Sequence, residues 1–168
     1  MESKVAEGLQ LRKPVLDDGK AVHDLIGNCP PLDLNSTYNY FLLCSHFSET
    51  CVVGEQDSSI LAFLSAYRLP KSPETLFVWQ VAVDGALRGH GMAGRMLEEV
   101  LVRPACRGVR YVETTVSPSN IPSRRFFERY AEKRQLGWHE ETFLTEEQFG
   151  GESHESEVLF RIGPLLKP

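Results

Sequence analysis

The chain has 168 residues, of which 42% are hydrophobic and 24% are charged, and its formal net charge is −5. This length suits one globular domain, and the composition excludes a disordered, collagen-like or coiled-coil protein. The acidic balance argues against a nucleic-acid partner, because such proteins neutralise phosphates with lysine and arginine. It favours cationic small molecules as ligands, although a negative surface also serves solubility alone.

We expect neither an export signal nor a membrane span. The first ten residues, MESKVAEGLQ, contain no apolar stretch of the signal-peptide type, and no apolar run approaches the roughly 20 residues of a transmembrane helix. The four cysteines lack Cys-x-x-Cys spacing and the five histidines are scattered, so no metal site is expected. These features indicate a cytoplasmic protein whose reduced cysteines pack as small hydrophobic residues.

The first half of the chain predicts one strand, two helices and a β-hairpin. A loop with the prolines Pro30 and Pro31 separates the helices, and Asn35 or Ser36 is expected to cap the second helix. Two apolar runs on either side of residues 56–59 predict the hairpin. In chain order the expected elements are Leu9–Lys13 (strand), Asp17–Ile26 (helix), Thr37–Phe47 (helix), Cys51–Glu55 (strand) and Ile60–Arg68 (strand).

The second half alternates strands and helices. Pro104 is expected to stop its first helix and Gly137 to close its second, and the acidic residues 146–156 read as a long loop. This alternation predicts an α/β domain. The expected elements are Leu76–Val83 (strand), Gly91–Arg103 (helix), Arg110–Val116 (strand), Asn120–Arg134 (helix), Trp138–Leu144 (strand) and Glu157–Ile162 (strand).

Hydrophobic spacing assigns a face to each predicted helix. The residues that share one side are Val22, Leu25 and Ile26 in the first helix, Tyr38, Phe41, Leu42 and Ser45 in the second, Met92, Met96, Leu97, Val100 and Leu101 in the third, and Phe126, Phe127 and Tyr130 in the fourth.

The segment from Phe77 to Leu97, FVWQVAVDGALRGHGMAGRML, predicts an anion site. A buried strand runs into a glycine-rich turn that opens an amphipathic helix. Gly89, Gly91 and Gly94 let backbone N–H groups face a bound group, and the helix N-terminus adds unsatisfied donors and partial positive charge. This combination suits a pyrophosphate.

Three other interpretations of the glycine-rich turn compete. A Walker A loop fails, because Arg95 and Met96 follow Gly94 where that motif needs Lys and Ser or Thr. The spacing of Gly89, Gly91 and Gly94 satisfies the dinucleotide pattern G-x-G-x-x-G, but that pattern belongs in the first βα turn of its fold. A tight turn in which glycine serves the backbone alone is the third alternative.

The segment Arg88–Ala93 matches the [QR]-x-x-G-x-[GA] pattern of the GNAT acetyltransferases. Asn120–Ser123, Phe126–Glu128 and Leu136–Trp138 resemble that family's Asn-led helix with its Gly-aromatic end. The resemblance implies one GNAT domain over residues 1–168. Its fold is a mixed central β-sheet, splayed at the cofactor strand, with flanking helices, and its co-substrate is acetyl-CoA.

Four strings of the sequence resemble, more narrowly, the L-2,4-diaminobutyrate acetyltransferases of ectoine synthesis: residues 30–36, 38–47, 78–83 and 115–120. The resemblance implies transfer of acetyl to the γ-amine of L-2,4-diaminobutyrate, a step in making a compatible solute, and a homodimer. Acetylation of another small amine or of a protein N-terminus is the alternative within enzymes. A non-catalytic acyl-CoA-binding module is the alternative outside them.

The same resemblance assigns the cofactor contacts. The strand before the glycine-rich turn would present its backbone to pantetheine, the turn would hold the pyrophosphate, and Asn120 would contact the pantetheine arm. The residues so assigned are Val81, Ala82 and Val83 on the strand, Arg88, Gly89, His90, Gly91, Met92, Ala93 and Gly94 in the turn, and Asn120.

Acetyl transfer to an amine needs a proton acceptor, because an alkylammonium has a pKa of about 10.4 in water. The candidate carboxylates are Glu113, Asp33 and Glu157. Glu113 lies in an otherwise β-branched strand, where an outward polar position is the alternative. Asp33 precedes a helix, where an interaction with the helix dipole is the alternative, and its family-like surroundings favour substrate contact.

Aromatic residues are expected to shape the acceptor site. Trp79 would line the acceptor site, and the alternative is that it packs in the core with Phe77, Val81 and Val83. Tyr38 would contact the substrate, and the alternative is that it is a core residue of its helix. By resemblance alone, His154 and Glu157 would close the site. Phe127 stands where many members of the family carry a tyrosine that protonates the departing thiolate, so the general acid is unassigned.

Overall fold

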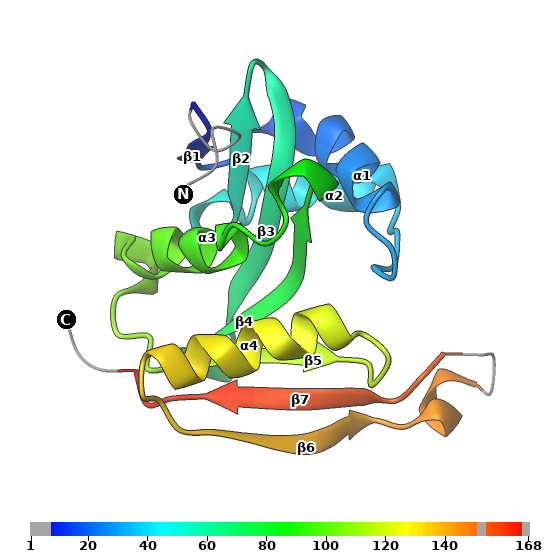
Figure 1. Cartoon of the computed structure of the whole chain (residues 1–168), viewed down its shortest axis with the longest axis vertical. Coiled ribbons are helices and arrows are strands. Elements are labelled where there is room, and N and C mark those ends of the chain that lie inside the picture. The colour runs from blue at the N-terminus through cyan, green and yellow to red at the C-terminus, as the bar shows by residue number, and fades with distance from the viewer. Residues whose placement is uncertain (1–7, 151–153, 166–168) are drawn as a thin grey trace. The chain divides into compact units, whose positions relative to one another are not determined.

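The structure, a computed structural model, describes residues 8–150 and 154–165. Within them the strand order of the sheet is β1-β2-β3-β4-β5-β7-β6 (Figure 1). β4 and β5 run parallel, and β5 and β7 antiparallel, so the sheet is mixed as predicted. The strands are β1 (Gln10–Arg12), β2 (Val52–Gln56), β3 (Ser59–Leu69), β4 (Ser72–Val83), β5 (Tyr111–Val116), β6 (Trp138–Leu144) and β7 (Glu157–Ile162). The α-helices are α1 (Gly19–Gly27), α2 (Thr37–Ser45), α3 (Met92–Leu101) and α4 (Ile121–Lys133).

Contacts divide the chain into two compact units. The first unit comprises residues 1–67 and 80–107, and the second comprises residues 68–79 and 108–168. The strands β3 and β4 contribute to both units. The expectation of a single domain stays a prediction, and each unit is described by itself.

Helices pack on both faces of the strands in the first unit. In the register of β2 and β3, Val53 opposes Phe63 and both join the core beneath α1 and α2, whereas Val52 and Leu64 point to the other face. α3 lies against β2 and crosses in front of β2 and β3 in the view of Figure 1. All four of these strand residues are therefore buried. The core of α1 is the predicted one, Val22, Leu25 and Ile26.

The hairpin between β2 and β3 has the predicted position. Asp57 and Ser58 form its turn, with φ angles of 49° and 61°. Positive φ at both central residues is the signature of the tight turns that match the twist of a hairpin. The neighbouring strand β4 begins at Ser72, four residues before the predicted start at Leu76.

The predicted face of α2 is wrong. The helix buries Tyr40, Leu43 and Cys44, while Tyr38 is 70% exposed. Aromatic and aliphatic residues surround this helix on almost every side, so hydrophobic spacing alone does not select a buried face. The predicted cap is confirmed at Ser36, whose Oγ accepts a hydrogen bond from the Asn39 N–H at 3.3 Å.

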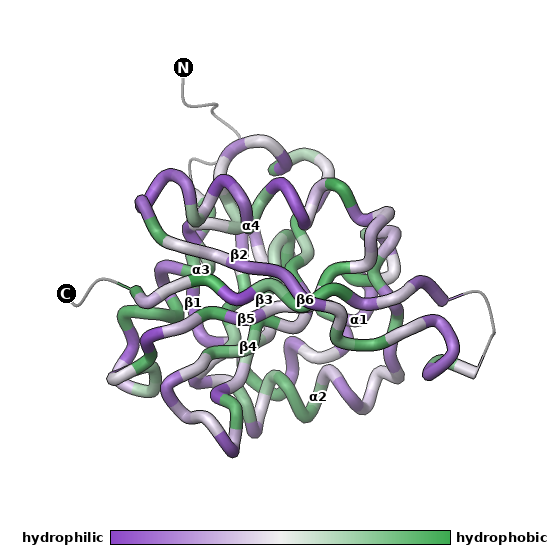
Figure 2. Tube along the Cα trace, turned by 90° about the horizontal axis from the view of Figure 1, so that it is seen from below, coloured by the Kyte–Doolittle hydropathy of each residue, from purple (hydrophilic) through white to green (hydrophobic). Residues whose placement is uncertain are grey.

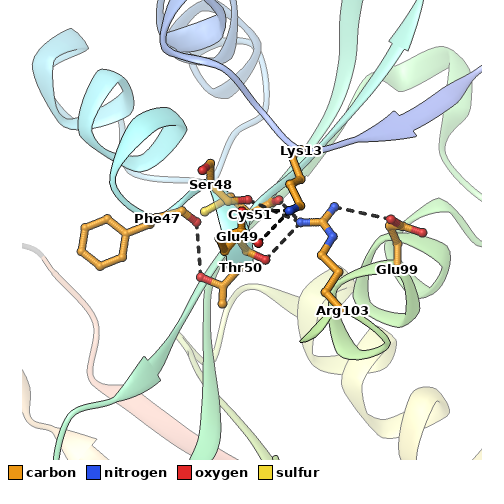
Figure 3. Close-up of polar contacts among 8 residues, drawn as sticks. All are labelled: Lys13, Phe47, Ser48, Glu49, Thr50, Cys51, Glu99 and Arg103. Carbon is orange, nitrogen blue, oxygen red and sulfur yellow. Dashed lines mark hydrogen bonds and ion pairs between the residues drawn. The ribbon is translucent and has the colours of Figure 1, made fainter. Parts of the chain in front are cut away.

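A buried guanidinium anchors the segment after α3 (Figure 3). The helix ends at Leu101 rather than at the predicted Arg103. Arg103 is 7% exposed, and its Nη1 donates to the carbonyl oxygens of Ser48, Glu49 and Cys51, the last at 2.7 Å. The backbone of Arg103 is extended, with ψ 150°, as is usual for a residue before proline, and its side chain satisfies three carbonyls of the segment before β2.

The second unit places α4 against β7. Figure 2 shows α4 as mostly hydrophilic with short hydrophobic stretches, and its buried residues are Phe127, Tyr130 and Ala131. Arg124 lies over the Phe160 ring at 5.3 Å from the centroid and bonds Glu140 on β6 at 2.6 Å. This one side chain ties the helix to both antiparallel strands.

The predicted stop of α4 at Gly137 is wrong. The residue in the left-handed conformation is Gln135, with φ 55°. The Leu136 N–H donates to the Ala131 carbonyl and the Gln135 N–H to that of Glu132, both at 3.0 Å. This pair of bonds is a Schellman motif with glutamine at the position that glycine usually takes. The acidic loop after β6 contains a short 3₁₀ helix, Glu146–Phe149, and its residues 151–153 lie outside the described part.

Candidate active site

The glycine-rich turn adopts the backbone that the anion site requires. Gly89 and Gly91 have φ angles of +80° and +72°, a region that other residues rarely adopt. Gly91 is the N-cap of α3 and carries no side chain, so no side-chain oxygen caps this end of the helix. Arg88 folds back so that its Nε donates to the Val83 carbonyl at 3.0 Å. The first-turn N–H groups of α3 are therefore donors suited to a phosphate.

The open space at these two glycines fits the same role. A Cβ built on Gly89 or on Gly91 meets no atom within 4 Å. The residues predicted for the pyrophosphate, Arg88 to Gly94, all belong to the first unit. Their arrangement fits a cofactor that carries a pyrophosphate.

Backbone pairing between β4 and β5 stops before the end of β4. The register runs from Thr75 opposite Tyr111 to Val78 opposite Thr114. Trp79 to Val83 lie beyond it, and within the described residues they have no β5 partner in this register. Val81, Ala82 and Val83, the residues assigned to pantetheine, belong to this segment, which agrees with the predicted splay of the sheet.

The first unit also contains the two residues assigned to the substrate at its loop and second helix. Asp33 is exposed, and its backbone carbonyl accepts a hydrogen bond from Gln80 Nε2 at 2.7 Å. Tyr38 is exposed, which excludes the core alternative for this residue. The structure thus attaches the Asp33 loop to the cofactor strand.

Sequence reasoning missed Gln80 and Tyr40. Gln80 is 4% exposed and Tyr40 is fully buried, and the Tyr40 hydroxyl donates to Gln80 Oε1 at 3.2 Å. The one available signal was Gln80 itself, a polar residue within an almost wholly apolar strand, which must find hydrogen-bond partners when buried.

Trp79 is not a core residue. It is 39% exposed, and the buried positions of β4 have the opposite parity, at Leu76, Val78, Gln80 and Ala82. The core alternative for Trp79 is therefore excluded, while its role as a wall of the acceptor site stays a prediction. Trp79 belongs to the second unit and Gln80, the next residue, to the first.

Glu113 is buried rather than outward-facing. It is 8% exposed, lies opposite Arg161 in the register of β5 and β7, and accepts a hydrogen bond from Arg161 Nη1. Arg161 Cζ also lies 3.9 Å from the centroid of the Tyr111 ring. The carboxylate thus has a structural partner, and its role as proton acceptor stays a prediction.

Asn120, His154 and Glu157 lie in the second unit. Asn120 caps α4, because its Oδ1 accepts a hydrogen bond from the Ser123 N–H at 3.3 Å, and this bond leaves its Nδ2 uninvolved. His154 stacks on Phe149 at 3.9 Å between centroids, and Glu157 begins β7. The Ser119 N–H donates to Glu155 at 2.9 Å, which joins the segment around His154 to the turn before Asn120.

The four cysteines, Cys29, Cys44, Cys51 and Cys106, are free and buried, as predicted. Burial raises the pKa of Cys44 and of Cys51 to about 12 from the ordinary 9.0. Across the residues that the structure describes, no three His, Cys, Asp or Glu side chains gather as metal ligands. In that same part of the chain no helix has the length and apolar character of a membrane span.

The glycine-rich turn before α3, the end of β4 that β5 leaves unpaired and the mixed sheet fit an acetyltransferase fold that binds an acyl-CoA. The model of the acetyltransferase (GNAT) family matches residues 20–131, and the chain belongs to this family.

The relatives are more specific than the family. The chain is 50% identical over 159 residues to the L-2,4-diaminobutyric acid acetyltransferase of Bordetella parapertussis, with 94% of this chain and 86% of that protein covered. It is 43% identical over 158 residues to the enzyme of the same name from Chromohalobacter salexigens, with 94% and 82% covered.

One solved structure resembles the chain in sequence and fold, and a more distant one resembles it in fold alone. The diaminobutyrate acetyltransferase EctA from Paenibacillus lautus, in complex with its substrate L-2,4-diaminobutyric acid and coenzyme A, superposes with a TM-score of 0.90 at 45% identity, covering 95% of this chain and 97% of that one. Ard1 from Thermoplasma volcanium shares the fold at a TM-score of 0.74 and 18% identity, covering 95% and 99%.

Proposed function

We propose that the chain is an acetyl-CoA-dependent L-2,4-diaminobutyrate N-γ-acetyltransferase that serves ectoine synthesis, acting as one domain over residues 1–168. The observation that carries the proposal is the likeness, over nearly the whole chain, to proteins named as diaminobutyrate acetyltransferases, one of them solved with diaminobutyric acid and coenzyme A. The uncapped N-terminus of α3 at Gly91 supports it independently, because it fits the pyrophosphate of the acyl donor.

Three parts of the chain would bind the acyl donor. The turn from Arg88 to Gly94 would hold the pyrophosphate through backbone N–H groups. The backbone of Val81, Ala82 and Val83 would bond the pantetheine, since β5 leaves these residues unpaired. The Nδ2 of Asn120 would reach the pantetheine arm, because the helix cap uses its Oδ1 alone.

The acceptor is a short diamine acid, and its two nitrogens must be distinguished. Asp33 would hold the α-ammonium through a charge-assisted hydrogen bond, which contributes roughly 1.5–3 kcal/mol. Trp79 would wall the methylenes, with Tyr38, His154 and Glu157 around the substrate. The γ-amine would then meet the thioester, and Glu113 would accept its proton, directly or through a water.

We further propose that the protein is cytoplasmic and forms a homodimer. The four reduced, buried cysteines suit a reducing compartment. The dimer is carried from the family resemblance, and sedimentation of the purified chain tests it. The dimer proposal fails if the chain sediments as a monomer across the concentrations used in the assays.

Free thiol released from acetyl-CoA tests the function. The purified chain is given diaminobutyrate, ornithine, lysine, a polyamine or a peptide N-terminus. Diaminobutyrate is expected to show the highest kcat/KM, and NMR of the product is expected to place acetyl on the γ-nitrogen. Equal kcat/KM for diaminobutyrate, ornithine and lysine would refute the substrate, and a mainly α-acetylated product would refute the orientation. Binding of acetyl-CoA without turnover of any amine would favour the non-catalytic module.

A further inference from the structure

A buried amide interrupts the apolar inner side of β4. Leu76, Val78 and Ala82 share the parity of Gln80, and all four are buried. An amide buried without partners costs free energy, so the partners of Gln80 show what it holds in place.

Both ends of the Gln80 side chain are hydrogen-bonded within the first unit. Nε2 donates to the Asp33 carbonyl at 2.7 Å, and Oε1 accepts from the Tyr40 hydroxyl at 3.2 Å. The Tyr40 oxygen in turn accepts from the Asn35 N–H at 3.2 Å. The network therefore binds the loop at two backbone groups, the Asp33 carbonyl and the Asn35 N–H, on either side of Leu34.

The backbone of Gln80 is also fixed. Its N–H donates to Ser65 Oγ on β3 at 3.1 Å, and Ser65 is fully buried. The amide that holds the Asp33 loop thus lies on a buried part of β4 that is hydrogen-bonded to β3, directly before the segment from Val81 to Val83. Asp33 is exposed, and its backbone carbonyl accepts the hydrogen bond from Gln80.

We propose that Gln80 and Tyr40 are positioning residues that fix the position of Asp33 relative to β4. The fixed position of Asp33 would then determine which chain length of diamine acid the enzyme prefers. The inference rests on the proposed function, because it takes Asp33 as the anchor of the α-ammonium. Diaminobutyrate and ornithine differ by one methylene, and a nucleophile misplaced by about one ångström loses rate heavily. A loop that is held in one position would discriminate between diaminobutyrate and ornithine, whereas a loop without these hydrogen bonds would not.

The test uses Tyr40→Phe and Gln80→Met, which keep side-chain size and remove the hydrogen bonds. For diaminobutyrate we expect kcat/KM to fall about ten-fold, and its ratio to that for ornithine to fall by a similar factor. The KM for acetyl-CoA should stay within about two-fold, since the glycine-rich turn is untouched.

Thr50→Val is the matched control. Thr50 is also buried in the first unit, and its hydroxyl donates to the Ala66 carbonyl at 2.5 Å, away from the Asp33 loop. It should lower the melting temperature without changing the diaminobutyrate to ornithine ratio. If Tyr40 had only a structural role, Tyr40→Phe and Thr50→Val would both lower the melting temperature and both leave the substrate ratio unchanged.

A double variant tests whether the network acts through Asp33. Asp33→Asn alone should weaken diaminobutyrate use by about ten- to a hundred-fold. Adding Tyr40→Phe to it should cause little further loss, because the anchor is already gone. Full, multiplicative losses would overturn the coupling.

The outcomes separate the two proposals. If the parent fails to acetylate diaminobutyrate, the proposed function fails. If the parent is selective and folded Tyr40→Phe keeps both its kcat/KM for diaminobutyrate and its selectivity, the positioning role is wrong. Should Gln80→Met not fold, Tyr40→Phe decides alone, since it removes a single oxygen.

Discussion

Gly91 combines a left-handed backbone with open space. Its φ is +72°, and no atom lies within 4 Å of an added Cβ. A β-branched residue strains this conformation, at a cost of about 1–2 kcal/mol, without any clash. Gly91→Val should therefore distort the turn and raise the KM for acetyl-CoA about ten-fold or more. Isothermal titration with coenzyme A measures the same loss directly.

Gly85→Ala is the control for that substitution. Gly85 also has no atom within 4 Å of an added Cβ, but its φ lies outside the left-handed region, so alanine fits. Arg88→Ala should cost less than Gly91→Val, because backbone groups supply most of the cradle. Parent-like affinity for coenzyme A in Gly91→Val would remove the pyrophosphate from this turn.

Glu113 and Arg161 form an ion pair, and kinetics of variants at each residue can distinguish a catalytic from a structural role of Glu113. Glu113→Gln removes the carboxylate, and as a loss of the proton acceptor it should lower kcat by about 10²–10⁴-fold. Arg161→Gln breaks the same ion pair but keeps the carboxylate, so its kcat should fall much less. If both variants lose stability and activity equally, Glu113 serves the fold, and Asp33 or Glu157 becomes the leading acceptor.

At the scale of elements, the helix α4 ends through an unusual residue. Gln135 holds the left-handed position of the Schellman motif, which costs a non-glycine residue about 1–2 kcal/mol. Gln135→Gly should raise the free energy of unfolding by about 0.5–1 kcal/mol, after the greater flexibility of glycine in the unfolded chain is subtracted. Urea unfolding followed by circular dichroism measures the change.

The sequence-based choice of Gly137 as the stop supplies the comparison. An added Cβ on Gly137 meets the Gly163 carbonyl at 3.6 Å, an ordinary contact, and its φ lies outside the left-handed region. Gly137→Ala should therefore change stability by less than about 0.5 kcal/mol. The opposite ranking of the two variants would place the stop at Gly137 after all.

Elements with one clear hydrophobic pattern were predictable from the sequence, and those without one were not. The spacing of Val22, Leu25 and Ile26 selects a single face of α1, which the structure buries. The apolar surface of α2 leaves several faces equivalent, and tertiary packing chose Tyr40 over Tyr38. The end of α4 was missed because a glutamine, Gln135, holds the left-handed position that glycine usually takes. The burial of Arg103 was missed because its partners lie 52 to 55 positions away in the chain.

At the scale of the whole molecule, the candidate site draws on residues far apart in the chain. The glycine-rich turn was recognisable from its own letters, because a phosphate cradle is a local motif. Asp33, Trp79, Glu113 and Glu157 came from family resemblance or residue type, since spacing in the sequence does not say which side chains converge. The network through Gln80 could be seen only in three dimensions, because its partners lie 40 and 47 positions away.

The buried thiols make the stability of the protein fall at alkaline pH. Burial raises the pKa of Cys44 and of Cys51 to about 12, and unfolding returns each to the ordinary 9.0. Above pH 9 the unfolded chain therefore releases protons that the folded chain keeps. The thiols' contribution to stability is complete below pH 9 and is lost as the pH rises toward 12. By pH 10 the loss should reach about 1.4 kcal/mol for each thiol.

Urea unfolding at pH 8, 9 and 10 measures this slope, and the double variant Cys44→Ala/Cys51→Ala isolates the part due to the thiols. The variant should be less stable at pH 8, because two buried side chains are truncated, yet it should lose less stability between pH 8 and 10. The two chains differ at these two cysteines alone, so the difference between their slopes reports the thiols. If the free energy of unfolding fell equally with pH in parent and variant, the thiols would not contribute to the slope. They would then become solvated, or ionise while buried, before the protein unfolds.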